Sequence, residues 1–520
     1  MKNYRFCKKK LLATNKGERA MGSNVGGLLR SRAVMMGEKI GFIHGGLRIS
    51  FKEMNERANS FAAYLQLQGF TKGDKIAILC KNNENVVAAF FGAAKIGVIV
   101  VMANWRLQPA ELQYIFTHSD AKLVVYDEVF QSVIDELEGQ IPATLFISKN
   151  TSPSFNEIWN GRAEEPLYAS GGDDPILIMY TSGTTGKPKG ALLSHNNLLA
   201  ASGGLSHTID WWEQDRFLMV APFFHIGGFA PLITNVHTGA TMILMEDFEP
   251  GAAWRIIEKE RITTMMTVPA MLAFLLKTYP MLKPDISSIR NITCGASAVP
   301  APLILGFRKL GIPIQQVYGI TEYTGAVTFW KESQNADKYD SMGKSVIQGT
   351  LRIAHIDSKE TLPPGEVGEI VIGGPQVFSG YYKNEEAYHA AVQNGEFHTG
   401  DLGYLDEDGF LYVVDRLKDM IISGGENIYS AELELALSLH PAIADVAVVG
   451  IPDEQWGEIP HAYIVKAADA SLSEEDVIAF CKEKLASYKT VKKVSFVDQL
   501  PRNAVGKILK NRLKEATTVQ

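Results

Sequence analysis

The chain has 520 residues, of which 46% are hydrophobic and 21% charged, a composition typical of a globular protein that folds as two or more domains. Its formal net charge of −7 argues against a nucleic-acid-binding protein, which would normally carry a basic face. The four cysteines, Cys7, Cys80, Cys294 and Cys481, form no CxxC pair, which predicts a reducing compartment and no structural metal site.

The N-terminal segment contains Lys8-Lys9-Lys10 but no apolar stretch of the kind that a secretory signal needs. We therefore expect a disordered extension over residues 1–20 and a cytoplasmic protein. An apolar segment at residues 86–105 is interrupted by Lys95 and two glycines. It predicts a buried helix followed by a buried strand at residues 98–102, in preference to a membrane span.

Short apolar segments typical of buried strands alternate with amphipathic segments typical of helices. The predicted strands lie at residues 75–80, 121–126, 176–180, 217–220, 240–244 and 263–267, and the predicted helices include 51–68 and 254–260. This alternation predicts an α/β fold with layered, largely parallel sheets. After Gly365, glycine-punctuated β segments at 369–372, 403–405 and 410–414 predict a subdomain that resembles a β-barrel.

A smaller unit follows Asp415. Its predicted helices lie at residues 430–439 and 474–485, and its predicted strands at 445–450, 462–465 and 494–497. No long linker separates the two units near residues 415–419, which favours a hinge. The expected organisation is a large N-terminal domain at 21–416 and a small, mobile α+β C-terminal domain at 417–520.

The segment "TSGTTGKPKG", residues 181–190, predicts a phosphate-binding loop. Its glycines allow the backbone to approach a ligand closely, and its hydroxyls and two lysines supply donors and positive charge. It is not a Walker A loop, because only two residues separate the first glycines and Pro188 follows Lys187.

Three further segments carry single charged residues in suitable contexts. Glu322 in "YGITE" is a candidate Mg²⁺ ligand, because Mg²⁺ prefers oxygen ligands that it shares with phosphate. Asp401 in "TGD" is suited to the two hydroxyls of a ribose. Lys507 lies at the tip of a loop that contains proline and glycine, in "PRNAVGK". Alone, each of these residues would read as a surface charge.

In this order, "YTSGTTGKPKG", "FFHIGG", "YGITE", "TGDLG", "DRLKDMIISGGENI" and "PRNAVGKILK" resemble the signatures of the acyl-adenylate-forming superfamily. This superfamily contains acyl-CoA synthetases, the adenylation domains of peptide synthetases and beetle luciferases. The resemblance covers the chain from Met21 onward.

The resemblance implies a role for each segment. Phosphates would bind to the loop, and Mg²⁺ to Thr181 and Glu322. Tyr318 would stack on adenine, Asp401 and Arg416 would hold the ribose, and Lys507 would reach the carboxylate and the α-phosphate. His225 would border the acyl carboxylate, although a histidine between aromatic residues is also an ordinary packing residue. The full set of implied nucleotide-binding residues is Thr181, Ser182, Gly183, Thr184, Thr185, Gly186, Lys187, Lys189, Gly295, Ala296, Ser297, Tyr318, Gly319, Thr321, Asp401, Arg416, Lys418, Gly424, Gly425 and Lys507.

The implied reaction is an ATP-dependent ligation of a carboxylic acid to coenzyme A. The acid attacks the α-phosphorus of ATP to give an acyl-adenylate and pyrophosphate, and the thiol of CoA then displaces AMP. Lys507 and Mg²⁺ would offset the repulsion between the two anions in the first step. Rotation of the C-terminal domain about a hinge at Lys418 would prepare the second step.

Three alternatives remain open at this point. An amino-acid-adenylating domain would place an aspartate where this chain has Phe224-His225, and a luciferase-like oxygenase would share every ATP motif. A non-catalytic nucleotide-binding protein would have no use for Lys507 and the hinge.

The identity of the acid stays open. The oligomeric state also stays open, with a homodimer as one candidate. Gly319 stands where acetate-specific relatives carry a tryptophan, so medium-chain, long-chain or aryl acids are expected in preference to acetate. Ser430 replaces a proline found in many members, and we expect this change to affect only the start of a helix.

Overall fold

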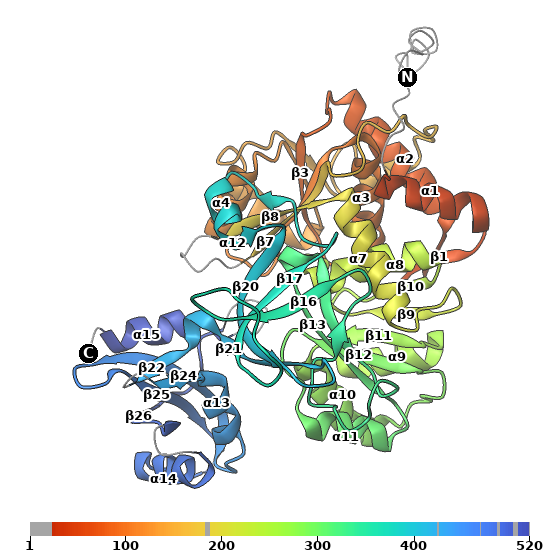
Figure 1. The fold of residues 1–520 in the computed structure, drawn as a ribbon. Helices are drawn as coiled ribbons and strands as arrows, with labels where there is room; N and C mark the ends of the chain where they lie inside the picture. Colours follow the sequence, from red (N-terminus) through yellow and green to blue (C-terminus); the bar gives the residue numbers. More distant parts are fainter. Residues whose placement is uncertain are drawn as a thin grey trace.

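The computed structural model describes residues 23–181, 188–423, 426–468, 470–485, 489–502 and 508–518, with side chains to residue 515. Two large sheets form the N-terminal part, a third sheet lies beside them, and a fourth belongs to the C-terminal part at the lower left of Figure 1. The α/β class and the small C-terminal domain expected from the sequence are thus confirmed.

The first large sheet has seven strands in the order β18-β8-β7-β4-β3-β5-β6. Its members β3 to β7 are parallel, and β8 and β18 are antiparallel to their neighbours. The strands are β3 (Lys75–Leu79), β4 (Ile99–Met102), β5 (Leu123–Tyr126), β6 (Leu145–Ile147), β7 (Pro175–Thr181), β8 (Lys189–Ser194) and β18 (Gly380–Tyr381). The accompanying helices are α2 (Phe51–Leu67), α3 (Glu84–Ile96), α4 (Pro109–Ser119), η2 (Glu128–Phe130), α5 (Gln131–Leu137) and α6 (Phe155–Trp159).

The second large sheet has nine strands in the order β15-β14-β13-β12-β11-β9-β10-β1-β2, with an all-parallel centre. The strands are β1 (Ile40–His44), β2 (Leu47–Ser50), β9 (Arg216–Met219), β10 (Thr241–Leu244), β11 (Thr264–Thr267), β12 (Asn291–Gly295), β13 (Ile314–Ile320), β14 (Gly325–Trp330) and β15 (Lys344–Ser345). Its helices are α1 (Val25–Met36), α7 (His195–Thr208), α8 (Ile226–Thr238), α9 (Pro250–Glu260), α10 (Pro269–Leu282), α11 (Ala301–Lys309) and η3 (Thr321–Tyr323).

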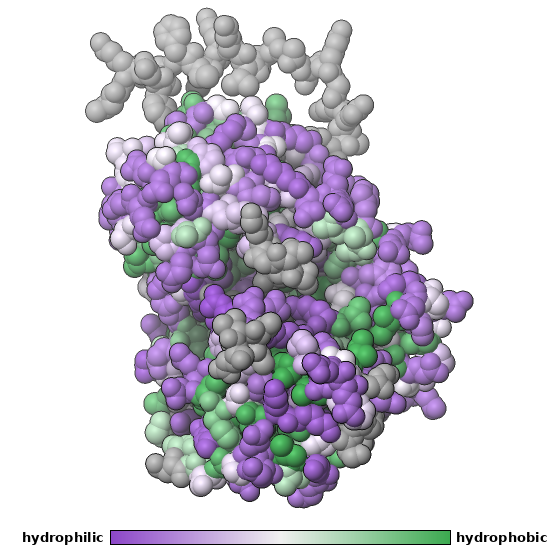
Figure 2. Space-filling view, turned by 90° about the vertical axis from the view of Figure 1, so that its left-hand side faces the viewer, coloured by the Kyte–Doolittle hydropathy of each residue, from purple (hydrophilic) through white to green (hydrophobic). Residues whose placement is uncertain are grey.

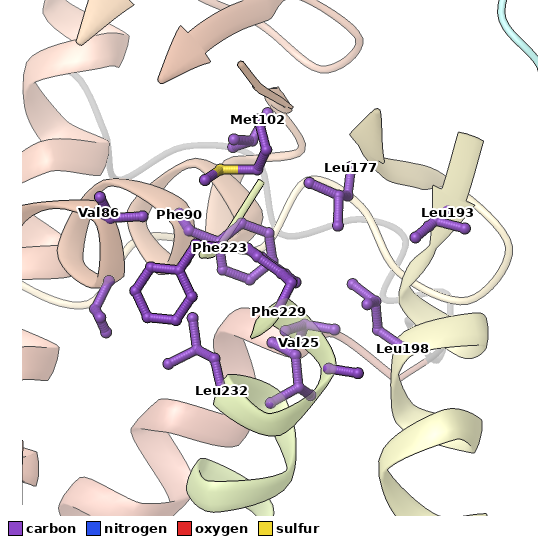
Figure 3. Packing of buried hydrophobic residues seen from close by; sticks show 14 of the residues in the cluster. Val25, Val86, Phe90, Met102, Leu177, Leu193, Leu198, Phe223, Phe229 and Leu232 are labelled. Carbon is purple, nitrogen blue, oxygen red and sulfur yellow. The ribbon is translucent and has the colours of Figure 1, made fainter. Parts of the chain in front are cut away.

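A hydrophobic core joins the two large sheets. Phe90 of α3 and Phe229 of α8 pack edge to face, with their ring centroids 4.7 Å apart. Figure 3 shows Val25, Met102 and Leu198 converging on the same core from three further elements. The strongly apolar sequences of α3 and α8 follow from this position, because both helices are covered on nearly all sides.

Lys95 is the charged residue that interrupts the apolar segment, and it lies fully buried near the end of α3. Its ammonium group donates to Asn55 Oδ1 and Asn59 Oδ1, both at 2.6 Å, and pairs with Glu165 at 2.7 Å. Burial lowers the pKa of Lys95 to about 8. The predicted helix and strand are therefore correct, and within the described residues no helix is long and apolar enough to cross a membrane.

The third sheet is half-barrel-like and antiparallel, as the sequence predicted for this region. It consists of β16 (Thr350–Ala354), β17 (Gly368–Gly373), β19 (Val392–Gln393), β20 (Glu396–Leu405) and β21 (Leu411–Arg416), with α12 (Glu385–Ala391) inserted before β19. Strand β21 leads directly into the short helix η4 (Leu417–Asp419) and then into the C-terminal part.

The C-terminal part is a small α+β unit with its own hydrophobic core. Its sheet contains β22 (Ile421–Ser423), β23 (Glu426–Ile428), β24 (Ile443–Asp453), β25 (Gly457–Lys466) and β26 (Lys493–Phe496). Its helices are α13 (Ser430–Ser438), α14 (Glu474–Lys484) and α15 (Lys510–Thr518). Figure 2 views the molecule from the side on which this unit lies, and polar residues cover most of that face.

Ser430 has a larger role than the sequence predicted. Its side chain is fully buried, and its hydroxyl donates to Asp415 Oδ2 at 2.8 Å and accepts from Lys510 Nζ at 2.7 Å. The expectation that this residue affects only the start of the helix is therefore wrong. Ser430 also ties α13 to the end of β21 and to α15.

Candidate functional site

The two ends of the predicted phosphate-binding loop lie side by side in the seven-stranded sheet. Thr181 ends β7 and pairs with Lys189 at the start of β8. The loop residues Ser182, Gly183, Thr184, Thr185, Gly186 and Lys187 lie outside the described residues. Ser194 then ends β8 and caps α7, because its hydroxyl accepts from the Asn197 N–H at 3.1 Å. The loop therefore has fixed strands on both sides.

Glu322 comes from the other large sheet and meets Thr181. The Thr181 hydroxyl donates to Glu322 Oε1 at 3.3 Å, although 141 residues separate the two in sequence. Tyr381 lies on β18, which pairs with β8, and it donates its hydroxyl to the same carboxylate oxygen at 2.9 Å. Burial and the neighbouring Glu322 carboxylate raise the pKa of Tyr381 well above its usual value, so it remains a donor at neutral pH. The result is a cluster of hard oxygen donors, which suits Mg²⁺.

A second cluster joins Tyr318, Asp401 and Arg416. The Tyr318 hydroxyl donates to Asp401 Oδ2 at 2.6 Å, and Arg416 Nε pairs with Asp401 Oδ1 at 2.8 Å. Asp401 and Arg416 are register partners on β20 and β21, and the Asp401 side chain is only 4% exposed. Burial, together with Asp401, raises the pKa of Tyr318. Both carboxylate oxygens are thus held in place by fixed donors.

Gly295, Ala296 and Ser297 lie beside Tyr318 at the carboxyl end of β12. Gly295 is the register partner of Val317, and a Cβ at Gly295 would stand 2.5 Å from Val317 Cγ1. Glycine is therefore required for β12 and β13 to pair here. Ala296 has φ of 71°, and the exposed Ala296 and Ser297 extend past the strand next to Tyr318. This arrangement places the predicted adenine-binding segments on adjacent strands.

His225 immediately precedes α8 and lies against Phe224, with 4.5 Å between the ring centroids. Burial, with a smaller effect of Arg106, lowers the pKa of His225 to about 4, so the ring is neutral at pH 7. Its buried Nε2 has no hydrogen-bond partner among the residues that the structure describes. This nitrogen is therefore free to bind a ligand group, and the role of His225 beside the acyl carboxylate stays a prediction.

The small residues near His225 differ in how much space they leave. A Cβ at Gly228 would lie 2.3 Å from Pro222 O, and a Cβ at Gly319 would lie 2.5 Å from Gly325 O. A Cβ at Gly325 would contact Ala230 Cβ at 3.3 Å. By contrast, a Cβ at Gly227 meets no atom within 4 Å in the described part of the chain. Gly227, rather than Gly319, borders open space.

The remaining predicted site residues are Thr321, Lys418, Gly424, Gly425 and Lys507. Lys418 is the central residue of η4 and is exposed, and Thr321 begins η3 next to Glu322. Gly424, Gly425 and Lys507 lie outside the described residues. Their predicted roles, like those of the other site residues, stay predictions.

Family models place the chain in a known group. The model described as AMP-binding enzyme matches residues 29–382, and the model described as AMP-binding enzyme C-terminal domain matches residues 432–507. The chain belongs to the AMP-binding enzyme family. The expected acyl-adenylate-forming superfamily is thereby confirmed for this AMP-binding enzyme. The predicted domain boundary at residues 416–417 falls between the two matched regions.

Several characterised proteins resemble this AMP-binding enzyme over nearly its whole length. A long-chain-fatty-acid–CoA ligase of Mycobacterium tuberculosis is 36% identical, and the match covers 95% of this chain and 98% of the relative. A 2-succinylbenzoate–CoA ligase of Bacillus mycoides is also 36% identical, over 90% of this chain and 94% of the relative. The structure of o-succinylbenzoate coenzyme A synthetase from Bacillus subtilis in complex with ATP and magnesium ion has a TM-score of 0.85 and 35% identity, with 94% of this chain and 99% of that chain covered.

Two residues of this AMP-binding enzyme were missed by the sequence analysis. Tyr381 contacts Glu322 from a short strand that carries no recognisable motif. Arg106 follows β4, and its guanidinium lies 4.8 Å from the Trp105 ring centroid and 5.9 Å from that of Phe224. No motif in the sequence distinguishes Arg106 from other loop arginines, because its aromatic neighbour Phe224 comes from a distant segment.

Proposed function

We propose that this AMP-binding enzyme is an ATP-dependent carboxylic acid–CoA ligase that prefers medium-chain, long-chain or aryl acids to acetate. The observation that carries the proposal is the pair of polar clusters, Thr181 with Glu322 and Tyr318 with Asp401 and Arg416. One suits Mg²⁺ and phosphate and the other suits a nucleoside, and Arg416 immediately precedes the predicted hinge.

The bound ATP would be held by side chains whose positions are already fixed by hydrogen bonds. Asp401 would accept from the ribose hydroxyls, and Arg416 would keep its carboxylate in place. Thr181 and Glu322 would hold Mg²⁺, which when bound neutralises phosphate charge and stabilises the pyrophosphate leaving group. Because Glu322 already accepts from two hydroxyls, its orientation is set before any ligand arrives.

The acid would enter beside His225. A carboxylate oxygen of the acid attacks the α-phosphorus of ATP, a new P–O bond forms, and the bond to pyrophosphate breaks. The neutral His225 ring can donate a hydrogen bond from Nε2 to the bound acyl group. It adds no positive charge that would make the carboxylate a weaker nucleophile. In the second step the thiolate of CoA attacks the acyl carbon, and AMP leaves with the electrons of the C–O bond.

The preference for larger acids rests on the relatives and on Gly227. The similar proteins include ligases named for a long-chain fatty acid and for 2-succinylbenzoate, and we assign the acyl chain to the open space beside the exposed Gly227. A cytoplasmic location, a homodimer and the boundaries 21–416 and 417–520 remain part of this proposal.

Two assays test the function: pyrophosphate release and CoA-dependent AMP formation. The substrates are linear acids from acetate to dodecanoate, together with benzoate and cinnamate. We expect both products with the larger acids and little of either with acetate. Pyrophosphate release without CoA-dependent AMP formation would identify an adenylating enzyme of another kind. ATP binding without pyrophosphate release with any acid would identify a non-catalytic nucleotide-binding protein.

A Glu322→Gln variant tests the metal cluster. The amide keeps the shape of the side chain but removes the charge, so we expect the Mg²⁺ concentration needed for half-maximal pyrophosphate release to rise at least tenfold. Glu396→Gln is a suitable control, because Glu396 pairs with Arg352 in the third sheet and should leave the Mg²⁺ requirement unchanged.

A further inference from the structure

A cavity of about 380 Å³ lies in the N-terminal part, and none of the candidate catalytic or nucleotide-binding residues lines it. Its volume falls in the range of small-molecule sites. Its walls come from the loops that follow β3, β5 and β6, from the ends of β1 and β10 in the other large sheet, and from α2 and α6.

The cavity occupies a topological switch point. In the seven-stranded sheet β3 and β5 are neighbours. The chain runs from β3 to β4 on one side of this pair, and from β5 to β6 on the other side. Open parallel sheets bind ligands in the crevice outside the carboxyl ends of two such strands. Lys81 and Asn85 follow β3, and Asp127 and Glu128 follow β5, so the lining residues come from that crevice.

The acidic groups of the cavity are already occupied. His44 lies between two carboxylates, with Nδ1 2.6 Å from Glu84 and Nε2 2.9 Å from Glu246. Asp127 accepts from the Lys81 N–H at 2.7 Å and from Asn83 at 2.8 Å. These contacts fix the walls, and a protonated His44 offsets one of the negative charges.

Two cationic side chains of the same cavity are uncommitted. Arg57 of α2 is half-buried, and Lys149 is exposed in the loop after β6. Neither side chain has a hydrogen bond or ion pair to another residue in the described part of the chain, although Arg57 is close enough to Glu84 to lower the pKa of that carboxyl. A ligand with two negative charges would satisfy both.

An aromatic wall completes the cavity. Trp159 of α6 stacks on Phe155 with 5.5 Å between centroids and an interplanar angle of 11°. Its indole N–H donates to Asn85 Oδ1 at 3.0 Å, which fixes the ring. A flat apolar group can pack against this wall.

We propose that this cavity is a second ligand site, which binds a phosphate monoester of an aromatic ring or nucleoside through Arg57 and Lys149. The phosphate dianion accepts from both cations, and the ring packs against the wall formed by Trp159 and Phe155. The site is separate from the nucleotide cluster around Asp401, so its occupancy does not require the proposed ligase reaction.

Calorimetric titration of the full-length chain with phenyl phosphate tests the site. An Asp401→Asn background weakens the proposed nucleotide site and leaves the cavity intact. We expect one phenyl phosphate per chain, with binding weakened at least tenfold by Arg57→Gln and by Lys149→Gln. Lys149 lies on an exposed loop, so that variant should fold normally, and Lys52→Gln on the outer side of α2 serves as the matched control.

Two further ligands sharpen the result. AMP should occupy two sites on the wild-type chain if the cavity accepts nucleoside phosphates. It should occupy one site if the cavity accepts only simple aryl phosphates. AMP thus distinguishes the two members of the proposed ligand class. Benzoate should bind at least tenfold more weakly than phenyl phosphate, because it carries a single charge. Absence of phenyl phosphate binding, binding that ignores both substitutions, or equal binding of benzoate would overturn the proposal.

Discussion

Substitution of Gly227 by tryptophan should shorten the acids that the enzyme accepts. Gly227 is the second residue of α8, two positions after His225, and its Cβ direction points into open space within the described structure. An indole there would occupy the room that we assign to the acyl chain. Each methylene that can no longer be buried costs about 0.8 kcal/mol, which is roughly a fourfold loss in kcat/KM. Exclusion of four methylenes would therefore lower kcat/KM by about 200-fold for a long acid.

The same substitution at Gly319 should fail for a steric reason. A Cβ at Gly319 lies 2.5 Å from Gly325 O and 3.2 Å from Ala326 Cα, so the paired strand β14 must move. Gly319→Ala should lower the free energy of unfolding by about 1–3 kcal/mol. Gly227→Ala should raise it by about 0.4–1 kcal/mol, because alanine restricts the unfolded chain and meets no obstacle in the helix.

The assays are kcat/KM for acids from C2 to C12 and urea unfolding of each variant. Gly203→Ala in α7 is a matched control, because its Cβ also meets no atom of the described residues within 4 Å. It should be stabilised to a similar degree without a change in acid preference. An unchanged chain-length profile in Gly227→Trp, or a Gly319→Ala variant as stable as Gly227→Ala, would refute the reasoning.

Three further predictions concern the hinge region and pH. Lys507→Ala should abolish adenylate formation but retain most CoA transfer from a supplied acyl-adenylate; equal loss in both half-reactions would remove the assigned role. Lys418→Pro should do the opposite, because proline fixes φ near −65° at the residue that we predict to rotate; equal loss would indicate misfolding instead. The hydrogen bond to Glu84 raises the pKa of His44 above 6.5, despite partial burial. Protonated His44 therefore stabilises the fold fully below pH 6.5, and this contribution is lost as pH rises through the raised pKa. The difference in unfolding free energy between wild type and His44→Gln should shrink over that range, and a constant difference would contradict the effect of Glu84 and Glu246.

The sequence by itself determined the family and the layered α/β class. Strand and helix positions followed from apolar segments with local punctuation, as at residues 86–105, where α3 and β4 form as expected. Ser194 and Ser473 cap their helices through contacts three residues away, which a sequence displays directly. Such features depend on neighbours along the chain, so the order of residues is sufficient to predict them.

Only the tertiary structure decided which groups meet and which glycine leaves room. Thr181 reaches Glu322 across 141 residues, and Tyr318 reaches Asp401 across 83. The sequence does not show which atoms surround the Cα of a glycine. Gly227 and Gly319 therefore look equivalent until β13 pairs with β14 and brings the Gly325 oxygen against Gly319. The buried role of Ser430 was hidden for the same reason, because its partners come from β21 and α15. Contacts of this kind depend on strand register and on the crossing of distant elements, which are fixed only when the whole chain packs.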